Sequence, residues 1–181
     1  MLSEPIKINQ IDAAEIIPHL YAIFRRDFID SAAILGGKIW VDPQVSRKSE
    51  GKEETFWHLT SRDDYTFEYV GGQRIKKWNA RFTDFDRSCR LAWVREIIDN
   101  HSHQEVSLFY HRETTGKKNI RLYLWAHAEK FVVILQKLGK SSTYLVTSFY
   151  VDNEGKESDY TKRLSSYHAE SDADLKGCEW F

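Results

Sequence analysis

The second half of the chain contains four consecutive strand-like segments, each seven or so residues long and rich in β-branched and aromatic residues. Short polar connections such as Gly139–Ser142 separate them. Strands joined by short connections usually pair as antiparallel neighbours, because a parallel pair needs a long crossover connection. The pattern therefore predicts an antiparallel meander. The segments span residues 105–110, 119–126, 131–138 and 143–151.

The first half has helical periodicity instead. In residues 11–31 the apolar positions recur at steps of three and four, and Pro18 either lies in the first turn of a second helix or kinks one longer helix. The clearest helix covers residues 83–99, where Thr83 can cap the first turn and Asp86 follows three positions later. Helices before a meander predict an α+β fold, with N-terminal helices packed on a four- to five-stranded antiparallel sheet.

Length and composition predict one globular domain. The chain has 181 residues, of which 41% are hydrophobic and 29% are charged. We expect residues 1–168 to form a single α+β domain and residues 169–181 to form an acidic C-terminal tail. No apolar run is long enough to cross a membrane, and the N-terminus lacks the pattern of a secretory signal, so a cytoplasmic protein without a membrane partner is expected.

The formal net charge of −1 conceals an uneven distribution. Residues 73–95 carry seven bases and two acids, a net charge of +5, and residues 111–121 carry a net charge of +3. Residues 152–181 have a net charge of −4. Clustered Lys and Arg neutralise phosphates in nucleic-acid complexes, although for any one charged run taken alone a solvated surface is the favoured interpretation.

Strand parity indicates which face of the meander could bind a ligand. Residues Ile120, Leu122, Leu124 and Ala126 form an apolar set that should face the helices. The opposite set, Arg121, Tyr123, Trp125 and His127, suits base stacking beside a phosphate. In the last strand, Ser148 and Tyr150 belong to a hydroxyl-rich set with Tyr144 that could share this face. Alternatively, the aromatic face packs on a partner or on the N-terminal helices.

One histidine is a candidate for proton transfer. His58 lies four residues before Arg62, and an imidazole can exchange protons at neutral pH while a guanidinium holds a phosphate. The competing interpretation is a hydrogen-bonded core histidine. His101 and His103 lack the carboxylates or paired cysteines of a zinc site, and the common nucleotide-binding motifs are absent, so neither a metal nor a cofactor is expected.

Five sequence blocks resemble the phage- and toxin-associated RNases of the Barnase–EndoU–ColicinE5/D–RelE superfamily. The resemblance implies helices packed on a four-stranded antiparallel sheet, together with metal-independent RNA cleavage. It covers roughly residues 55–165. The blocks are FWHLTSR (56–62), R-x-x-R-x-x-W-V-R-E-I-I (87–98), RLYLW (121–125), FVVIL (131–135) and YLVTSFYV (144–151).

The resemblance also implies roles for individual residues. His58 would be the general base or acid, Arg62 would contact the phosphate, and Lys130 would stabilise transition-state charge. The family's [ST]-x-[FY] element fits both residues 147–149 and residues 148–150, and parity favours Ser148 with Tyr150. A second catalytic histidine is left open among His101, His103, His111 and His127. The expected substrate-binding residues are Arg87, Arg90, Arg121, Tyr123, Trp125 and Thr147.

The first functional hypothesis is therefore an RNA-cleaving enzyme of a phage or other mobile element, acting as a toxin. Its partners would be RNA and an antitoxin, immunity or host protein. The second hypothesis is a non-catalytic RNA- or protein-binding module that uses the aromatic and basic sheet face. A third is a structural or inhibitory protein that docks a host partner.

Overall fold

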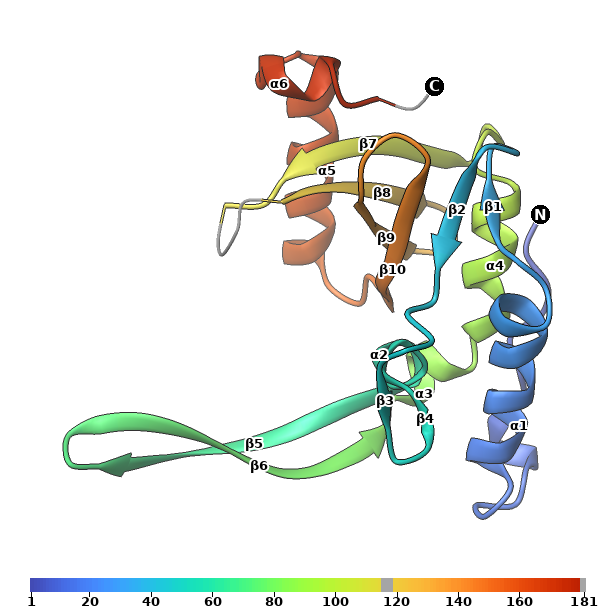
Figure 1. Ribbon diagram of the computed structural model, residues 1–181, viewed down its shortest axis with the longest axis vertical. Coiled ribbons are helices and arrows are strands. Elements are labelled where there is room, and N and C mark those ends of the chain that lie inside the picture. The colour runs from blue at the N-terminus through green and yellow to red at the C-terminus, as the bar shows by residue number, and fades with distance from the viewer. Residues whose placement is uncertain (115–118, 180–181) are drawn as a thin grey trace.

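The computed structural model describes residues 1–114 and 119–179 and has an α+β fold built on one six-stranded sheet (Figure 1). The four-stranded meander predicted from the sequence is confirmed. The strands, in the order in which they lie in the sheet, are β1 (Ile34–Leu35), β2 (Ile39–Asp42), β10 (Ser142–Tyr150), β9 (Phe131–Lys137), β8 (Ile120–Ala126) and β7 (Val106–Arg112).

The prediction of a purely antiparallel sheet of four to five strands is wrong. Strand β2 runs parallel to β10, with Trp40 opposite Ser142 and Val41 opposite Thr143, and β1 pairs with β2 at the edge. This pairing joins segments about 100 residues apart. A prediction based on short connections between neighbouring strands therefore cannot find it. The sheet is therefore mixed.

Helices that precede the meander cover one face of the sheet. They are α1 (Ile16–Phe24), which continues into a π-helical turn η2 (Arg25–Ile29), and α4 (Leu91–Asp99). Not all the helices are N-terminal as predicted, because α5 (Glu154–His168) and α6 (Ala173–Lys176) follow the meander. A short 3₁₀ turn, η1 (Ile8–Gln10), precedes them. Pro18 lies in the first turn of α1, where a missing N–H costs nothing. The meander's apolar set, including Leu122 and Leu124, faces these helices as predicted.

The single helix predicted over residues 83–99 is instead two helices. The first, α3 (Phe85–Ser88), ends before α4 begins. Thr83 does not cap it; the Asp84 carboxylate accepts a hydrogen bond from the Arg87 backbone N–H at 3.3 Å. A carboxylate at this position satisfies one of the free N–H groups at a helix start, so the cap lies one residue later than expected, at Asp84 instead of Thr83.

The opposite face of the sheet is covered by the C-terminal helix α5 (Glu154–His168) (Figure 1). Tyr160 of α5 packs against Tyr123 and Trp125, whose exposed fractions are 1% and 2%. The Arg163 guanidinium donates to the Tyr123 hydroxyl at 2.7 Å, and that hydroxyl donates to Glu113 at 2.6 Å. The prediction that this face is an exposed stacking surface is therefore wrong. The face is covered by a C-terminal helix of the same chain, and not by a partner or by the N-terminal helices.

A β-bulge also overturns the parity argument for the last strand. The pairing of β10 with β9 shifts between Leu145 and Thr147, which leaves Val146 as an extra residue. Beyond the bulge, Ser148 lies opposite Val133 and Tyr150 opposite Phe131, on the α4 side of the sheet. Ser148 and Tyr150 therefore face away from Tyr123 and Trp125 and do not share a face with Tyr144, which lies before the bulge.

The described part of the predicted acidic tail packs on the sheet edge. Helix α6 (Ala173–Lys176) lies against β7, and Arg112 of that strand bonds Asp172 at 2.8 Å. Leu175 and Cys178 are buried there. Lys117 and Lys118 of the second basic segment, and Phe181 at the tail's end, lie outside the described residues.

A long two-stranded hairpin extends from the body of the protein (Figure 1). Its strands are β5 (Ser61–Val70) and β6 (Gln73–Thr83), and we call this hairpin the arm. Gly71 and Gly72 form its turn with φ of +58° and +81°, a conformation that favours glycine at both positions. The arm follows α2 (Glu54–Thr60) and a small hairpin of β3 (Lys48–Ser49) and β4 (Lys52–Glu53). The polar sequence of residues 44–54, which has no periodicity, predicts a loop where this hairpin lies.

Within the described ranges, no helix has both the length and the apolar character needed to cross a membrane.

Candidate functional site

Of the pockets at the root of the arm, two contain the candidate residues Arg62 and His58, one on each side of β5. Side chains alternate along a strand, so Arg62 points to one side while Ser61 and Asp63 point to the other. The Arg62 pocket has a volume of about 290 Å³ and is lined by Arg62, Asp84, Asp86, Arg87, Phe149, Tyr150, Asp152 and Lys156. The His58 pocket has a volume of about 250 Å³ and is lined by Ser49, Glu54, Trp57, His58, Ser61, Asp63 and Arg81.

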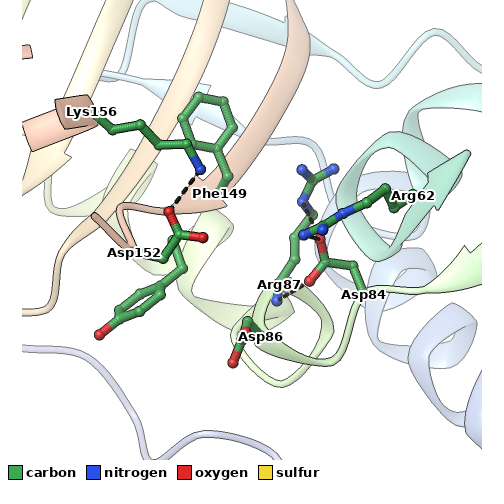
Figure 2. A pocket seen from close by; sticks show the side chains of 8 residues that line it. Arg62, Asp84, Asp86, Arg87, Phe149, Asp152 and Lys156 are labelled. Carbon is green, nitrogen blue, oxygen red and sulfur yellow. Dashed lines mark hydrogen bonds and ion pairs between the residues drawn. The ribbon is translucent and has the colours of Figure 1, made fainter. Parts of the chain in front are cut away.

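The cations of the Arg62 pocket are all paired with carboxylates (Figure 2). The Arg62 guanidinium lies 2.9 Å from the Asp84 carboxylate, and the Arg87 guanidinium lies 3.8 Å from the same group. Lys156 pairs with Asp152 at 2.7 Å. Burial lowers the pKa of Arg87, while the neighbouring Asp84 raises it. A phosphate entering this pocket therefore has to compete with carboxylates that are already in place.

Arg87 also fixes the end of α2. Its guanidinium donates to the backbone carbonyl of His58 at 2.6 Å, and the Thr147 hydroxyl donates to the same carbonyl at 3.2 Å. The last carbonyls of a helix have no partner within the helix, so these two donors stabilise its C-terminal turn. Arg87 and Thr147, predicted as substrate-binding residues, thus position the backbone that carries His58.

The His58 pocket combines an imidazole, a carboxylate and a guanidinium. His58 is exposed on α2, and Glu54 lies one helical turn before it on the same face. Across the pocket, the Arg81 guanidinium lies 4.7 Å from the centre of the Trp57 ring and bonds both Asp63 at 3.2 Å and Glu50 at 3.0 Å. The Trp57 indole donates to the Ser49 carbonyl at 2.8 Å, which fixes the wall of the pocket.

The catalytic residues predicted from the sequence do not converge in one pocket. Arg62 and Tyr150 line the Arg62 pocket, whereas His58 lines the other. The Ser148 side chain is fully buried at 0% exposure, and its hydroxyl has no hydrogen-bond partner among the described residues. Lys130 lies in the β8–β9 turn and pairs with Glu157 of α5 at 3.6 Å. Ser148 and Lys130 are therefore withdrawn from the catalytic set.

The other predicted binding residues have structural contacts. The Arg90 guanidinium lies 4.3 Å from the centre of the Tyr150 ring, and Arg121 lies 3.7 Å from Glu113. Of the candidate second histidines, His127 stacks on Trp125, with ring centroids 3.6 Å apart. His111 is half-buried beside Tyr123. These two residues, like His101 and His103, line neither pocket.

Two residues that line the His58 pocket, Glu54 and Arg81, were not predicted as site residues from the sequence. The spacing of four residues between Glu54 and His58 was available in the sequence, but residues 44–54 have no periodicity that predicts a helix start. Arg81 was counted only as part of a basic segment. Its position depends on the register of the arm, where an irregularity beside Asn79 sets Arg81 opposite Asp63.

Within residues 1–114 and 119–179, no cluster of three or more His, Cys, Asp or Glu side chains has a metal-binding arrangement. Comparisons of the chain with protein-family models, with curated proteins and with solved structures give no match.

Proposed function

We propose that the protein cleaves RNA without a metal ion at the His58 pocket. The observation that supports this proposal is an exposed imidazole in the same pocket as the carboxylate of Glu54 and the guanidinium of Arg81. Metal-independent cleavage needs a base to remove the proton of the ribose 2′-hydroxyl and an acid to protonate the leaving 5′-oxygen. The attack of the 2′-oxygen on phosphorus leaves a 2′,3′-cyclic phosphate and a free 5′-hydroxyl.

The pocket supplies one candidate for each task. His58 and Glu54 divide the roles of acid and base, since imidazole and carboxyl groups are common general acids and bases in enzymes. Arg81 stabilises the charge that develops on the phosphate. Arg62 and Tyr150, on the other side of β5, are assigned to a flanking nucleotide and not to the reacting phosphate.

The pairing of Arg81 with two carboxylates favours a second candidate function, which is RNA binding without cleavage. Arg81 is shared between Asp63 and Glu50, so the reacting phosphate has to displace a carboxylate before Arg81 can contact it. If that exchange does not occur, the pocket can hold a nucleotide without cleaving it. A cytoplasmic role as a toxin of a mobile element, and an antitoxin or immunity partner, are proposals that depend on the family resemblance alone.

The test measures cleavage of a labelled single-stranded RNA in EDTA by the protein and by two variants. We expect His58→Ala to reduce the rate by about 10²- to 10⁴-fold, the usual contribution of a general acid or base. His19→Ala, which removes an exposed imidazole on α1, is the matched control and should leave the rate unchanged. Equal cleavage by His58→Ala and the parent protein would remove His58 from the mechanism, and bound but intact RNA would favour the second candidate.

A further inference from the structure

The arm carries aromatic and cationic side chains together on one face. Cross-strand partners in an antiparallel pair share a face, and the register pairs Tyr65 with Trp78, Phe67 with Lys76, and Tyr69 with Arg74. We call these six residues the aromatic face. The opposite face carries Thr66, Glu68, Val70, Gln73, Ile75 and Lys77.

The aromatic face does not contribute to the core of the protein. None of the side chains of residues 62–83, all of which the structure describes, belongs to a hydrophobic core cluster. Phe67 is 48% exposed, Trp78 is 52% exposed and Tyr69 is 73% exposed. Large exposed apolar groups that gather on one surface usually mark an interaction site, because soluble monomeric proteins rarely leave such a patch open to water.

Cations lie directly on these rings. The Arg74 guanidinium is 3.7 Å from the centre of the Phe67 ring, and the Lys76 ammonium is 3.4 Å from the centre of the Tyr65 ring. Residues 65–78 contain three bases and one acid, so this part of the arm is positive in a chain whose net charge is −1. The arm therefore offers planar stacking surfaces and positive charge at alternating positions.

This chemistry fits an unpaired polynucleotide. Unpaired bases stack on aromatic rings and on arginine planes, while the neighbouring phosphates pair with Lys and Arg. The bases of a duplex are already stacked on each other, so a duplex would use the charge of the arm but not its rings. A second copy of this chain would meet the same positive charge on its own arm, which opposes self-association through this face.

The aromatic face leads into the His58 pocket. One carboxylate, that of Asp63, accepts hydrogen bonds from the Tyr65 hydroxyl, the Trp78 indole and the Arg81 guanidinium, each at 3.2 Å. Asp63 and Arg81 also line the His58 pocket. The last aromatic pair of the arm and the candidate catalytic pocket are thus joined through a single side chain.

We infer that the aromatic face of the arm is a binding platform for single-stranded RNA and leads the strand to the His58 pocket. The second part of this inference depends on the proposed function, because it names the substrate of that pocket. The binding itself does not depend on cleavage, so the two can be tested separately.

The test is fluorescence anisotropy with a labelled poly(U) strand, in EDTA and with His58→Ala present in every protein to prevent turnover. We expect Phe67→Ala/Tyr69→Ala to weaken binding by about 10- to 100-fold, since each lost stacking contact weakens binding several-fold or more. The matched control is Val70→Ala/Ile75→Ala, which removes exposed apolar side chains from the opposite face of the same arm. This control variant should bind the strand with the same affinity as the protein that carries His58→Ala alone.

A second pair of variants tests the cations. Lys76→Gln should reduce the slope of log K against log salt concentration by about one, the contribution of one phosphate contact. Lys77→Gln should change this slope less, because Lys77 lies on the opposite face and pairs with Glu68. Circular dichroism and thermal unfolding of all variants check that the fold is intact. Because the altered side chains are exposed, no loss of structure is expected.

The outcomes separate the two proposals. Equal weakening by the variants of both faces, or no weakening by either, overturns the platform. A dimer of the parent protein that the Phe67→Ala/Tyr69→Ala variant loses in size-exclusion chromatography also overturns it, because a second copy would then occupy the face. Binding that needs the aromatic face without cleavage by the protein with native His58 refutes only the ribonuclease proposal. Cleavage that needs His58 but not the aromatic face refutes only the platform.

Discussion

Replacement of Trp125 by alanine tests whether the aromatic sheet face is core or ligand surface. Trp125 is 2% exposed beneath α5, and truncation of a buried Trp costs about 3–5 kcal/mol of unfolding free energy. Its indole N–H has no hydrogen-bond partner among the described residues, so alanine also removes an unsatisfied buried donor that costs about 1–3 kcal/mol. The midpoints of these two ranges give a net loss of about 2 kcal/mol.

Trp125→Phe tests the contribution of the unsatisfied indole N–H by itself. Phenylalanine keeps most of the buried ring and removes the unsatisfied N–H, so the free energy of unfolding should stay within about 1 kcal/mol of the parent value. Urea unfolding of the three proteins at one pH measures these differences. The matched control is Trp78→Ala on the arm, where a 52% exposed indole should affect RNA binding more than stability. A Trp125→Ala protein of unchanged stability and weakened RNA binding would refute the burial argument.

Two further predictions concern single interactions. Asp84→Ala removes both the cap of α3 and the partner of Arg62 and Arg87, so we expect urea unfolding to show a loss of about 1–3 kcal/mol. Asp84→Asn removes the ion pairs but can still cap, so it should lose less, and equal losses would contradict the contribution of the cap. Burial, and then the charge of Arg163, lowers the pKa of His111, so the folded state binds fewer protons than the unfolded state and stability should fall as the pH drops through about 6.5. His111→Gln should reduce this acid-dependent loss in urea titrations at several pH values, and an unchanged pH profile would show that other groups cause it.

The sequence was most informative where structure depends on local pattern. The four strands of the meander and the apolar face of Leu122 and Leu124 follow from alternation and short connections, and the structure has both. The sequence also indicates a last short helix over residues 158–168. In the structure α5 begins four residues earlier, at Glu154, because the Asn153 side chain accepts a hydrogen bond from the Lys156 N–H and caps the helix there.

The candidate site depended on features that local pattern does not contain. One extra residue, Val146, moves Ser148 and Tyr150 to the other side of the sheet, and nothing in the alternation of β10 distinguishes a bulge from a regular strand. Helix α5 buries Tyr123 and Trp125 through a contact between distant segments. The aromatic and cationic chemistry that the sequence predicts for the sheet lies instead on the arm. There the sequence indicates a strand over residues 65–70 and a basic segment, but not the pairing that brings their side chains onto one face.

The parallel pair of β2 and β10 has a consequence for the order in which the chain can fold. Val41 finds its strand partner in Thr143, about 100 positions later, and contacts of such large sequence separation form slowly because a long loop must close first. During synthesis on the ribosome, β2 can pair with β1, but its other edge stays without a partner until most of the polypeptide has emerged. Completion of the sheet becomes a late event in biosynthesis, and a chain truncated before β10 leaves the N-terminal third without its docking strand.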